Sequence, residues 1–434
     1  MQQDMEKTWL GHPRGLFVLF LVEMWERFSY YGMRALLVFY MTKQLLFSQE
    51  DASHVYGLYT GLVYMTPLFG GLLADRFLGQ RRAVYIGGTL MAIGHFLMAF
   101  ESLFFPALGF LIAGNGLFKP NISTQVGSLY PAGDKRRDSA FSIFYVGVNL
   151  GAFLAPLTCG TLGVVVGWHY GFGLAGVGMM VGLLIYLYGQ RYLKPDRLTA
   201  RKESSAEAEA PLTLREKQKI AALVLLCLLT IPFWAAFEQQ GNTLALWFDS
   251  DTDRQIGEWE VPQTWFQSLN PMFIFTLTPV ITAFWAWQAG RGAQPGAIAK
   301  MVRGCLLLGA SFLVLVPAGI WYDVNGTPVS MWWLVASTLV MTLGELYLSP
   351  IGMSMVTKLA PARAVSMCMG IWYLSQFAGN LLAGYIGGFW EVLSRFHFFL
   401  LLASLVFGAA CANAVYLYIM KRSRLREDML RVFS

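Results

Sequence analysis

Apolar segments of about 20 residues recur along the whole chain and limit what it can fold into, because an α-helix of this length crosses roughly 30 Å of hydrocarbon. Of the 434 residues, 56% are hydrophobic and only 13% are charged, unlike an average soluble domain. The segments are continuous and lack the alternating pattern of an outer-membrane barrel. We therefore predict an all-α membrane protein. Its twelve expected spans are residues 15–42, 54–74, 82–101, 103–125, 138–160, 168–190, 220–247, 264–288, 298–320, 330–357, 363–390 and 396–420.

The basic residues are distributed unevenly between the two sides of the expected membrane. If the N-terminus is cytoplasmic, 26 of the 32 Lys and Arg lie in inside loops and termini, whereas the outside loops hold only Lys43, Arg254 and Arg395. Cytoplasmic loops of membrane proteins carry such an excess. The distribution predicts a multi-pass plasma membrane protein, of the inner membrane in a bacterium, with both termini cytoplasmic. It also explains the net charge of +6 without a nucleic acid partner.

One polar segment divides the apolar ones into two equal groups. Residues 191–219 are charged, rich in Ala, Ser and Glu, and without apolar periodicity, which is typical of a linker. We predict an N-terminal six-helix bundle at 1–190, a cytoplasmic linker at 191–219 and a C-terminal six-helix bundle at 220–434. Paired halves of this kind move against each other about a central binding site.

The first expected span is unusual because it contains charges. At 100° per residue, its four charged residues and two of its tyrosines fall within an arc of about 140°; they are Glu23, Glu26, Arg27, Tyr30, Tyr31 and Arg34. A charge that faces lipid costs several kcal/mol, so this stripe must face a protein-lined or watery interior. Glu23 and Arg27 are four residues apart and can pair along the helix. The stripe is either a static ion-pair network or part of a functional site, and we favour the site because apolar packing joins helices at lower cost.

Other spans contribute Lys119, Glu238 and Glu345, so four carboxylates face three cations inside the expected membrane. An unpaired carboxylate in an apolar cavity tends to take up a proton unless the positive charge of a ligand replaces it. The three cations belong to the first half, whereas Glu238 and Glu345 belong to the second. A substrate with one anionic and one cationic end fits this arrangement best.

The sequence shows no pattern that indicates catalysis or metal binding. The five cysteines lie inside expected spans without a CxxC pair, so we expect core residues and neither disulfides nor a metal site. No span contains HExxH, GxSxG or a paired-Asp pattern, which argues against an intramembrane enzyme. We expect no cofactor other than protons as the coupling ion. The five histidines are interpreted as surface or packing residues.

Several motifs resemble known transporter sequences. GGLLADRFLGQRR at 70–82 resembles the loop between helices two and three of the major facilitator superfamily, where Gly71 and Gly79 would permit close helix approach and a tight turn. EMWERFSYYG at 23–32 resembles the signature of the proton-dependent oligopeptide transporter family within that superfamily. Supporting motifs are GNGLFKPNIS at 114–123, SIFYVGVNLGA at 142–152, EQQGNT at 238–243, WFQSLNP at 265–271 and GELYLSPIG at 344–352.

This resemblance implies a major facilitator fold of twelve transmembrane helices in two six-helix bundles. Many bacterial members insert two additional helices between the bundles, but the 191–219 linker is too short and too polar to hold them. The resemblance further implies a monomeric symporter in the lipid bilayer that imports di- and tripeptides with protons by alternating access.

The resemblance also implies a role for each matching residue. Proton coupling would involve Glu23, Glu26, Arg27 and Glu238, and Arg34 would form a gating salt bridge with Glu238. The substrate-binding residues would be Arg34, Lys119, Tyr30, Tyr31, Tyr64, Asn149, Asn270, Glu345 and Trp372. Animal relatives use a helix-two His for coupling, but the corresponding position here is Gly57, so we place coupling on carboxylates.

Two further interpretations remain open. The same fold could carry another small solute, such as nitrate or a metabolite, as plant relatives do. Glu345 argues for peptides, because a carboxylate that binds an ammonium group would be useless for a bare anion. A nutrient receptor without transport would use the same cavity, but it would not need a spare titratable carboxylate.

Overall fold

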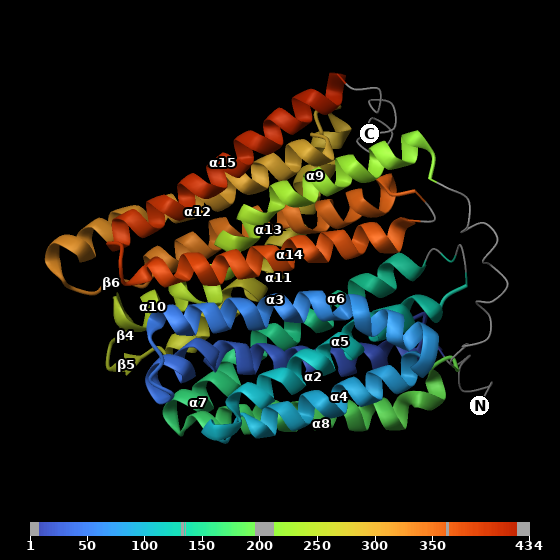
Figure 1. Cartoon of the computed structure of the whole chain (residues 1–434), viewed down its shortest axis with the longest axis horizontal. Coiled ribbons are helices and arrows are strands. Elements are labelled where there is room, and N and C mark those ends of the chain that lie inside the picture. Colours follow the sequence, from blue (N-terminus) through green and yellow to red (C-terminus); the bar gives the residue numbers. More distant parts are fainter. Residues whose placement is uncertain (1–7, 132–133, 135, 196–211, 362–363, 423–434) are drawn as a thin grey trace. The chain divides into compact units, whose positions relative to one another are not determined.

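The computed structural model describes residues 8–131, 134, 136–195, 212–361 and 364–422 (Figure 1). The described residues are helical apart from three short strand pairs. Their contacts divide the chain into two compact units, and each is described by itself. Unit 1 consists of Met1–Leu46, Leu62–Glu203 and Thr264–Met272, and unit 2 consists of Phe47–Gly61, Ser204–Gln263 and Phe273–Ser434.

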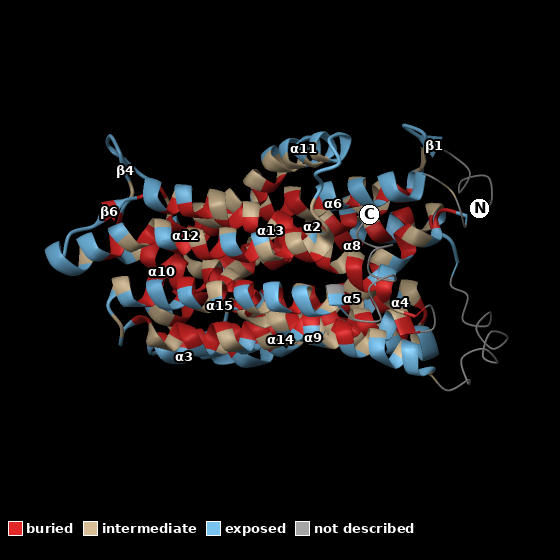
Figure 2. Cartoon of the chain, turned by 90° about the horizontal axis from the view of Figure 1, so that it is seen from above, coloured by how far each residue is buried: buried red, intermediate tan, exposed pale blue. Residues whose placement is uncertain are grey.

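Unit 1 is built around α2, which packs against α6 and α8, while α4 packs against α5 and α8. α2 is buried nearly all round, whereas α4 and α8 bury one side and expose the other, so that buried and exposed residues alternate along these two helices (Figure 2). Its elements are β1 (Thr8–Trp9), β2 (His12–Pro13), α2 (Arg14–Phe39), η1 (Tyr40–Gln44), the second part of α3 (Gln49–Leu73), η2 (Ala74–Leu78), α4 (Gln80–Leu97), η3 (Glu101–Leu103), α5 (Phe104–Ser128), α6 (Arg136–Ala155), η4 (Pro156–Gly160), α7 (Thr161–Val165), α8 (Trp168–Gly189) and η5 (Gln190–Tyr192).

Unit 2 contains the first part of α3, and within it α12 packs against α13 and α15 while α9 packs against α14. A capping box starts α9: Thr213 accepts from the Glu216 amide and Glu216 accepts from the Thr213 amide. Its other elements are α9 (Leu214–Phe237), η6 (Glu238–Gly241), α10 (Thr243–Ser250), β3 (Thr252–Asp253), β4 (Gln255–Ile256), β5 (Trp259–Glu260), α12 (Ala297–Asn325), β6 (Val329–Ser330), α13 (Trp332–Leu359), α14 (Val365–Gly387), η9 (Gly388–Trp390) and α15 (Arg395–Arg422). Two elements are divided between the units: η7 (Gln263–Ser268) belongs to unit 1 from Thr264 on, and α11 (Leu269–Gly290) belongs to unit 1 up to Met272 and to unit 2 from Phe273 on.

Nine segments in the described part of the chain are long and apolar enough to cross a membrane: Gln49–Leu78, Glu101–Ser128, Arg136–Val165, Trp168–Tyr192, Leu214–Ser250, Gln263–Gly290, Ala297–Asn325, Trp332–Leu359 and Arg395–Met420. The all-α prediction is confirmed, and the count of twelve spans stays a prediction. The expected span 220–247 is not one uninterrupted α-helix, because α9 ends at Phe237 and the tighter turn η6 separates it from α10.

The two units match the two halves of the sequence apart from two segments. Residues 47–61, from the first half, belong to unit 2, and residues 264–272, from the second half, belong to unit 1. In unit 1, Ser268 donates to the Phe153 carbonyl at 2.7 Å, and the Trp265 indole donates to the Thr161 hydroxyl at 2.7 Å. The division at residues 190 and 220 stays a prediction.

Glycines set the closest helix contacts. A Cβ on Gly57 would lie 2.6 Å from the Asn380 carbonyl oxygen and 2.6 Å from the Gly384 Cα, so α3 and α14 touch backbone to backbone in unit 2. In the 70–82 motif, Gly79 has φ +79° and ends η2, which confirms the tight turn. The close approach falls on Gly70, which lies against the Gly116 carbonyl, whereas Gly71 has only ordinary contact with Pro120. The predicted role of Gly71 is therefore wrong by one residue.

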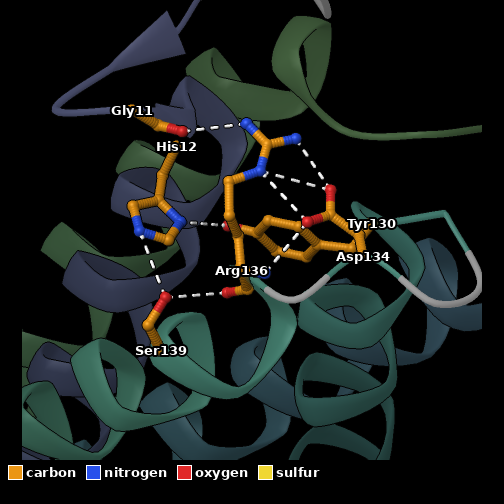
Figure 3. Close-up of polar contacts among 6 residues, drawn as sticks. All are labelled: Gly11, His12, Tyr130, Asp134, Arg136 and Ser139. Carbon is orange, nitrogen blue, oxygen red and sulfur yellow. Dashed lines mark hydrogen bonds and ion pairs between the residues drawn. The ribbon is translucent and has the colours of Figure 1, made fainter.

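The β1–β2 hairpin is tied to the turn between α5 and α6 by polar contacts (Figure 3). The Tyr130 hydroxyl is 2.8 Å from His12 Nδ1, and Arg136 donates to the Gly11 carbonyl at 3.0 Å. Arg136 also pairs with Asp134 at 2.7 Å, and its hydrogen bonds lower the pKa of that carboxyl to about 2. A carboxyl with a lowered pKa stabilises the folded state, and this stabilisation is lost as the pH falls through the lowered pKa. The Arg136–Asp134 ion pair is therefore intact at neutral pH.

We predict that Gly57→Ala lowers the apparent Tm of the purified protein, because the added methyl group collides with helix backbone, a kind of overpacking that costs ~1–3 kcal/mol. Gly109→Ala is the matched control, since Gly109 is also helical but its Cβ would meet nothing within 4 Å. Alanine is the better helix former, so the control should keep or raise the Tm. Thermal unfolding in detergent measures both, and an equal change in the two variants would contradict the close contact.

Candidate functional site

The charged stripe of α2 forms a compact ion cluster within unit 1. Arg27 Nη2 donates to Glu26 Oε1 at 2.8 Å, and its Nε donates to Glu26 Oε2. The same Nε lies 3.2 Å from Glu23 Oε1. Only 4% of Glu23, 0% of Glu26 and 4% of Arg27 is exposed. The sequence predicted the Glu23–Arg27 pair, but the two hydrogen bonds of Arg27 in this cluster both go to Glu26.

A glycine on α6 explains why the cluster is buried. Gly151 lies against the Met24 carbonyl, and a Cβ on it would be 2.9 Å from the Phe28 amide nitrogen and 3.0 Å from the Arg27 Cβ. The α6 backbone therefore lies directly on α2 beside Arg27. Asn149, also on α6, is 5% exposed and donates to the Tyr145 carbonyl at 2.9 Å.

The two carboxylates and one guanidinium of the cluster have one more negative charge than positive charge. Two carboxylates share a single guanidinium, and Glu23 Oε2 has no hydrogen-bond partner in the described part of the chain. Lys119, on α5, also attracts both carboxylates electrostatically. The cluster is therefore near neutrality only while Lys119 is available to it.

Aromatic rings hold the cations of unit 1. The Lys119 ammonium lies 4.7 Å from the centre of the Tyr64 ring, and the Arg34 guanidinium lies 5.8 Å from that of Tyr31. Arg27 lies 5.3 Å from the Tyr30 ring in the same way. Such cation–π contacts fix a cation without neutralising it.

The other two acids expected from the sequence, Glu238 and Glu345, belong to unit 2. Glu238 is 3% exposed and begins η6. The next residue, Gln239, accepts from the Thr243 hydroxyl at 2.8 Å and donates to the Ala383 carbonyl at 2.9 Å, which anchors the turn against α14. Glu345 is partly exposed on α13.

The last two predicted residues lie in different surroundings. Trp372 is fully buried on α14, 6.2 Å from the Trp234 ring and against Gly352, and its indole nitrogen has no partner among the described residues. Asn270 is partly exposed near the start of α11, in unit 1. The structure thus brings Glu23, Glu26 and Arg27 into contact in one cluster. Arg34 and Glu238 belong to different units, and their pairing stays a prediction.

The histidines and cysteines of the described residues show no sign of metal binding. No group of three His, Cys, Asp or Glu that could hold a metal occurs among the residues the structure describes. The five cysteines are free, and Cys411 is the exposed one. His95 is fully buried in α4, with both ring nitrogens unpartnered in the described region; its place in an apolar span gave no signal for this in the sequence.

Candidate membrane-spanning helices and a buried ion cluster on α2 are features expected of a membrane transporter, and the comparisons identify the family. Residues 81–204 and 204–396 match the family model PTR2, the POT family. The chain therefore belongs to the POT family, whose members are transporters and not enzymes.

Similar proteins span nearly the whole chain. The chain is 38% identical to the peptide transporter YePEPT of Yersinia enterocolitica subsp. palearctica, with 88% of this chain and 89% of that one covered. It is 34% identical to a di-/tripeptide transporter of Lactococcus lactis subsp. cremoris, covering 91% and 93%. It also resembles a crystal structure of a mutant of peptide transporter POT in complex with alafosfalin, with 33% identity, a TM-score of 0.86 and 99% of each chain covered.

We predict that Arg27→Met strongly destabilises the protein, because it leaves two buried carboxylates without their guanidinium; removing one partner of a buried ion pair costs ~3–5 kcal/mol. Adding Glu26→Gln to that variant should restore part of the loss, since one negative charge is removed. Unfolding midpoints of the wild type, both single variants and the double variant measure this coupling. Strictly additive effects would contradict the ion cluster.

Proposed function

We propose that this protein imports di- and tripeptides together with protons, by alternating access. The observation that carries the proposal is the buried cluster of Glu23, Glu26 and Arg27, which has one carboxylate more than it has cations and lies within reach of Lys119. The peptide cargo is supported by the relatives, which are named as peptide and di-/tripeptide transporters.

Competition for Lys119 would couple the proton to the peptide. When the carboxylate of a peptide binds Lys119, Glu23 and Glu26 lose that cation and keep only Arg27. A proton on one of the two carboxylates then restores neutrality in the apolar interior. By linkage, a proton that favours peptide binding is itself held more tightly when the peptide is bound. Glu238 is a further candidate in the proton path.

The charges of the two units would recognise the two ends of a peptide. Arg34 and Lys119 would attract its carboxylate, and Glu345, with Asn149 and Asn270, would receive its amino group. Tyr30, Tyr31, Tyr64 and Trp372 would shape the space for peptide side chains. In the same proposal, Arg34 and Glu238 form a salt bridge that gates the outer side.

The membrane arrangement belongs to the same proposal. We infer twelve spans in two six-helix bundles, both termini in the cytoplasm, the bacterial inner membrane as location, and a monomer in the bilayer. The uneven distribution of Lys and Arg supports this orientation.

The first experiment is uptake of labelled dialanine into proteoliposomes, with an inward proton gradient imposed or abolished. The wild type should concentrate dialanine only with the gradient. Glu26→Gln should still exchange dialanine across the bilayer but lose concentrative uptake by at least tenfold, because its cluster no longer takes up and releases the proton. Glu391→Gln is the matched control, since Glu391 is exposed, and it should behave as the wild type. Wild-type uptake that is the same with and without the proton gradient would refute proton coupling.

A second variant tests the cargo. Glu345→Gln should raise the dialanine concentration for half-maximal uptake about tenfold or more, since a charge-assisted hydrogen bond contributes ~1.5–3 kcal/mol. N-acetylated dialanine, which lacks the free amino group, should compete only weakly with dialanine for uptake by the wild type. It should compete equally weakly for uptake by this variant. If nitrate inhibits uptake by the wild type and unlabelled dialanine does not, the small-anion alternative would be favoured instead of peptides.

A further inference from the structure

A surface cavity lies at one end of the pair α4 and α8, both in unit 1 and away from the ion cluster described above. It has a volume of about 410 Å³ and is lined by Arg81, Arg82, Tyr85, Leu187 and Gln190. This volume falls within the range of small-molecule sites. The lining combines two cations with apolar and hydrogen-bonding groups, and none of the five residues is acidic.

The two arginines are in different situations. Arg81 donates to the Lys194 carbonyl at 3.0 Å, to the Gln190 carbonyl at 3.1 Å and to the Leu193 carbonyl, so it holds the chain after α8 against the start of α4. Arg81 thus forms part of the cavity wall through its contacts with this segment. Arg82 is exposed and makes no ion pair or hydrogen bond with the residues that the structure describes. The cavity therefore carries the positive charge of Arg82, and the hydrogen bonds of Arg81 fix the chain segment beside it.

An apolar surface continues from the cavity along both helices. On α4 the exposed residues Arg82, Tyr85, Ile86, Ile93 and Phe96 fall on one helical face, with the arginine at its end. On α8 one face exposes Val177, Met180, Leu184, Leu187 and Tyr188. Gly88 lies against Met179 and Leu183, so the two helices are side by side. The exposed tyrosines at the ends nearest the cavity are typical of the membrane interface.

We propose that this cavity binds the headgroup of an anionic phospholipid, with its acyl chains along the exposed faces of α4 and α8. Arg82 pairs with the lipid phosphate, Tyr85 and Gln190 offer hydrogen bonds to the headgroup, and Leu187 contacts the start of the acyl chains. A zwitterionic lipid fits less well, because its own cation would be repelled by Arg82. Basic pockets between membrane helices recognise anionic headgroups through this chemistry. The inference is independent of the peptide cargo and of proton coupling.

The test is thermal unfolding of the full-length protein in detergent, titrated with phosphatidylglycerol or with phosphatidylcholine. Phosphatidylglycerol should raise the Tm of the wild type by several degrees more than phosphatidylcholine does. Arg82→Gln should need about fivefold more phosphatidylglycerol for the same shift, because one arginine near a lipid surface contributes ~1 kcal/mol. Arg303→Gln, which removes another exposed arginine, is the matched control and should respond as the wild type.

Two further arms keep the proposal falsifiable. Leu187→Glu places a carboxylate in the cavity wall and should abolish the difference between the two lipids, while its Tm in phosphatidylcholine shows that it is folded. Glycerol 3-phosphate at millimolar concentration should give no shift, since it has no acyl chain. The proposal is overturned if Arg82→Gln responds as the wild type, if Arg303→Gln loses the response equally, or if glycerol 3-phosphate reproduces the effect of the lipid.

Discussion

The burial of two carboxylates and one guanidinium on α2 is the constraint on which much of unit 1 depends. Each of these ions would cost several kcal/mol against lipid, so this part of α2 has to be enclosed by protein. Within unit 1, α6 and α8 both pack against α2. Gly151 is what lets α6 come close enough, because any side chain at that position would meet the α2 backbone beside Arg27. The chemistry of one helix thus dictates the residue type on another.

Small residues also lie at other helix contacts among the described residues. Lipid tails are as apolar as Leu, so burying apolar side chains does little to join helices inside a membrane, and close van der Waals contact has to do it. Gly57 with Gly384, and Gly70 with Gly116, are pairs in which backbone meets backbone. The sequence stretches GVNLG at 147–151 and GYIGG at 384–388 contain Gly151 and Gly384, which lie at such contacts.

Some features could be predicted from sequence because they follow local rules. Span length gives the helices, and the four-residue spacing gives the Glu23–Arg27 pair. The hydrogen bonds of Arg27 to Glu26 could not be predicted this way, since neighbours in a helix do not normally face each other and the long arginine side chain has to fold back. The assignment of residues 47–61 to unit 2 was equally out of reach. It depends on the Gly57 contact with α14, between segments more than 300 residues apart, and periodicity within one helix carries no information about such a contact.

Three cations of unit 1, Arg27, Arg34 and Lys119, lie beside tyrosine rings. Lys119 lies over the Tyr64 ring, and its positive charge also attracts Glu23 and Glu26. Its charge is therefore shared among a ring, a cluster with one excess carboxylate and any anion that enters. A proton and an anion that act on one shared cation change each other's affinity by the same factor, tenfold for each ~1.4 kcal/mol of coupling. In the proposed mechanism, Lys119 is the cation that links the two, without any contact between the anion and the carboxylates.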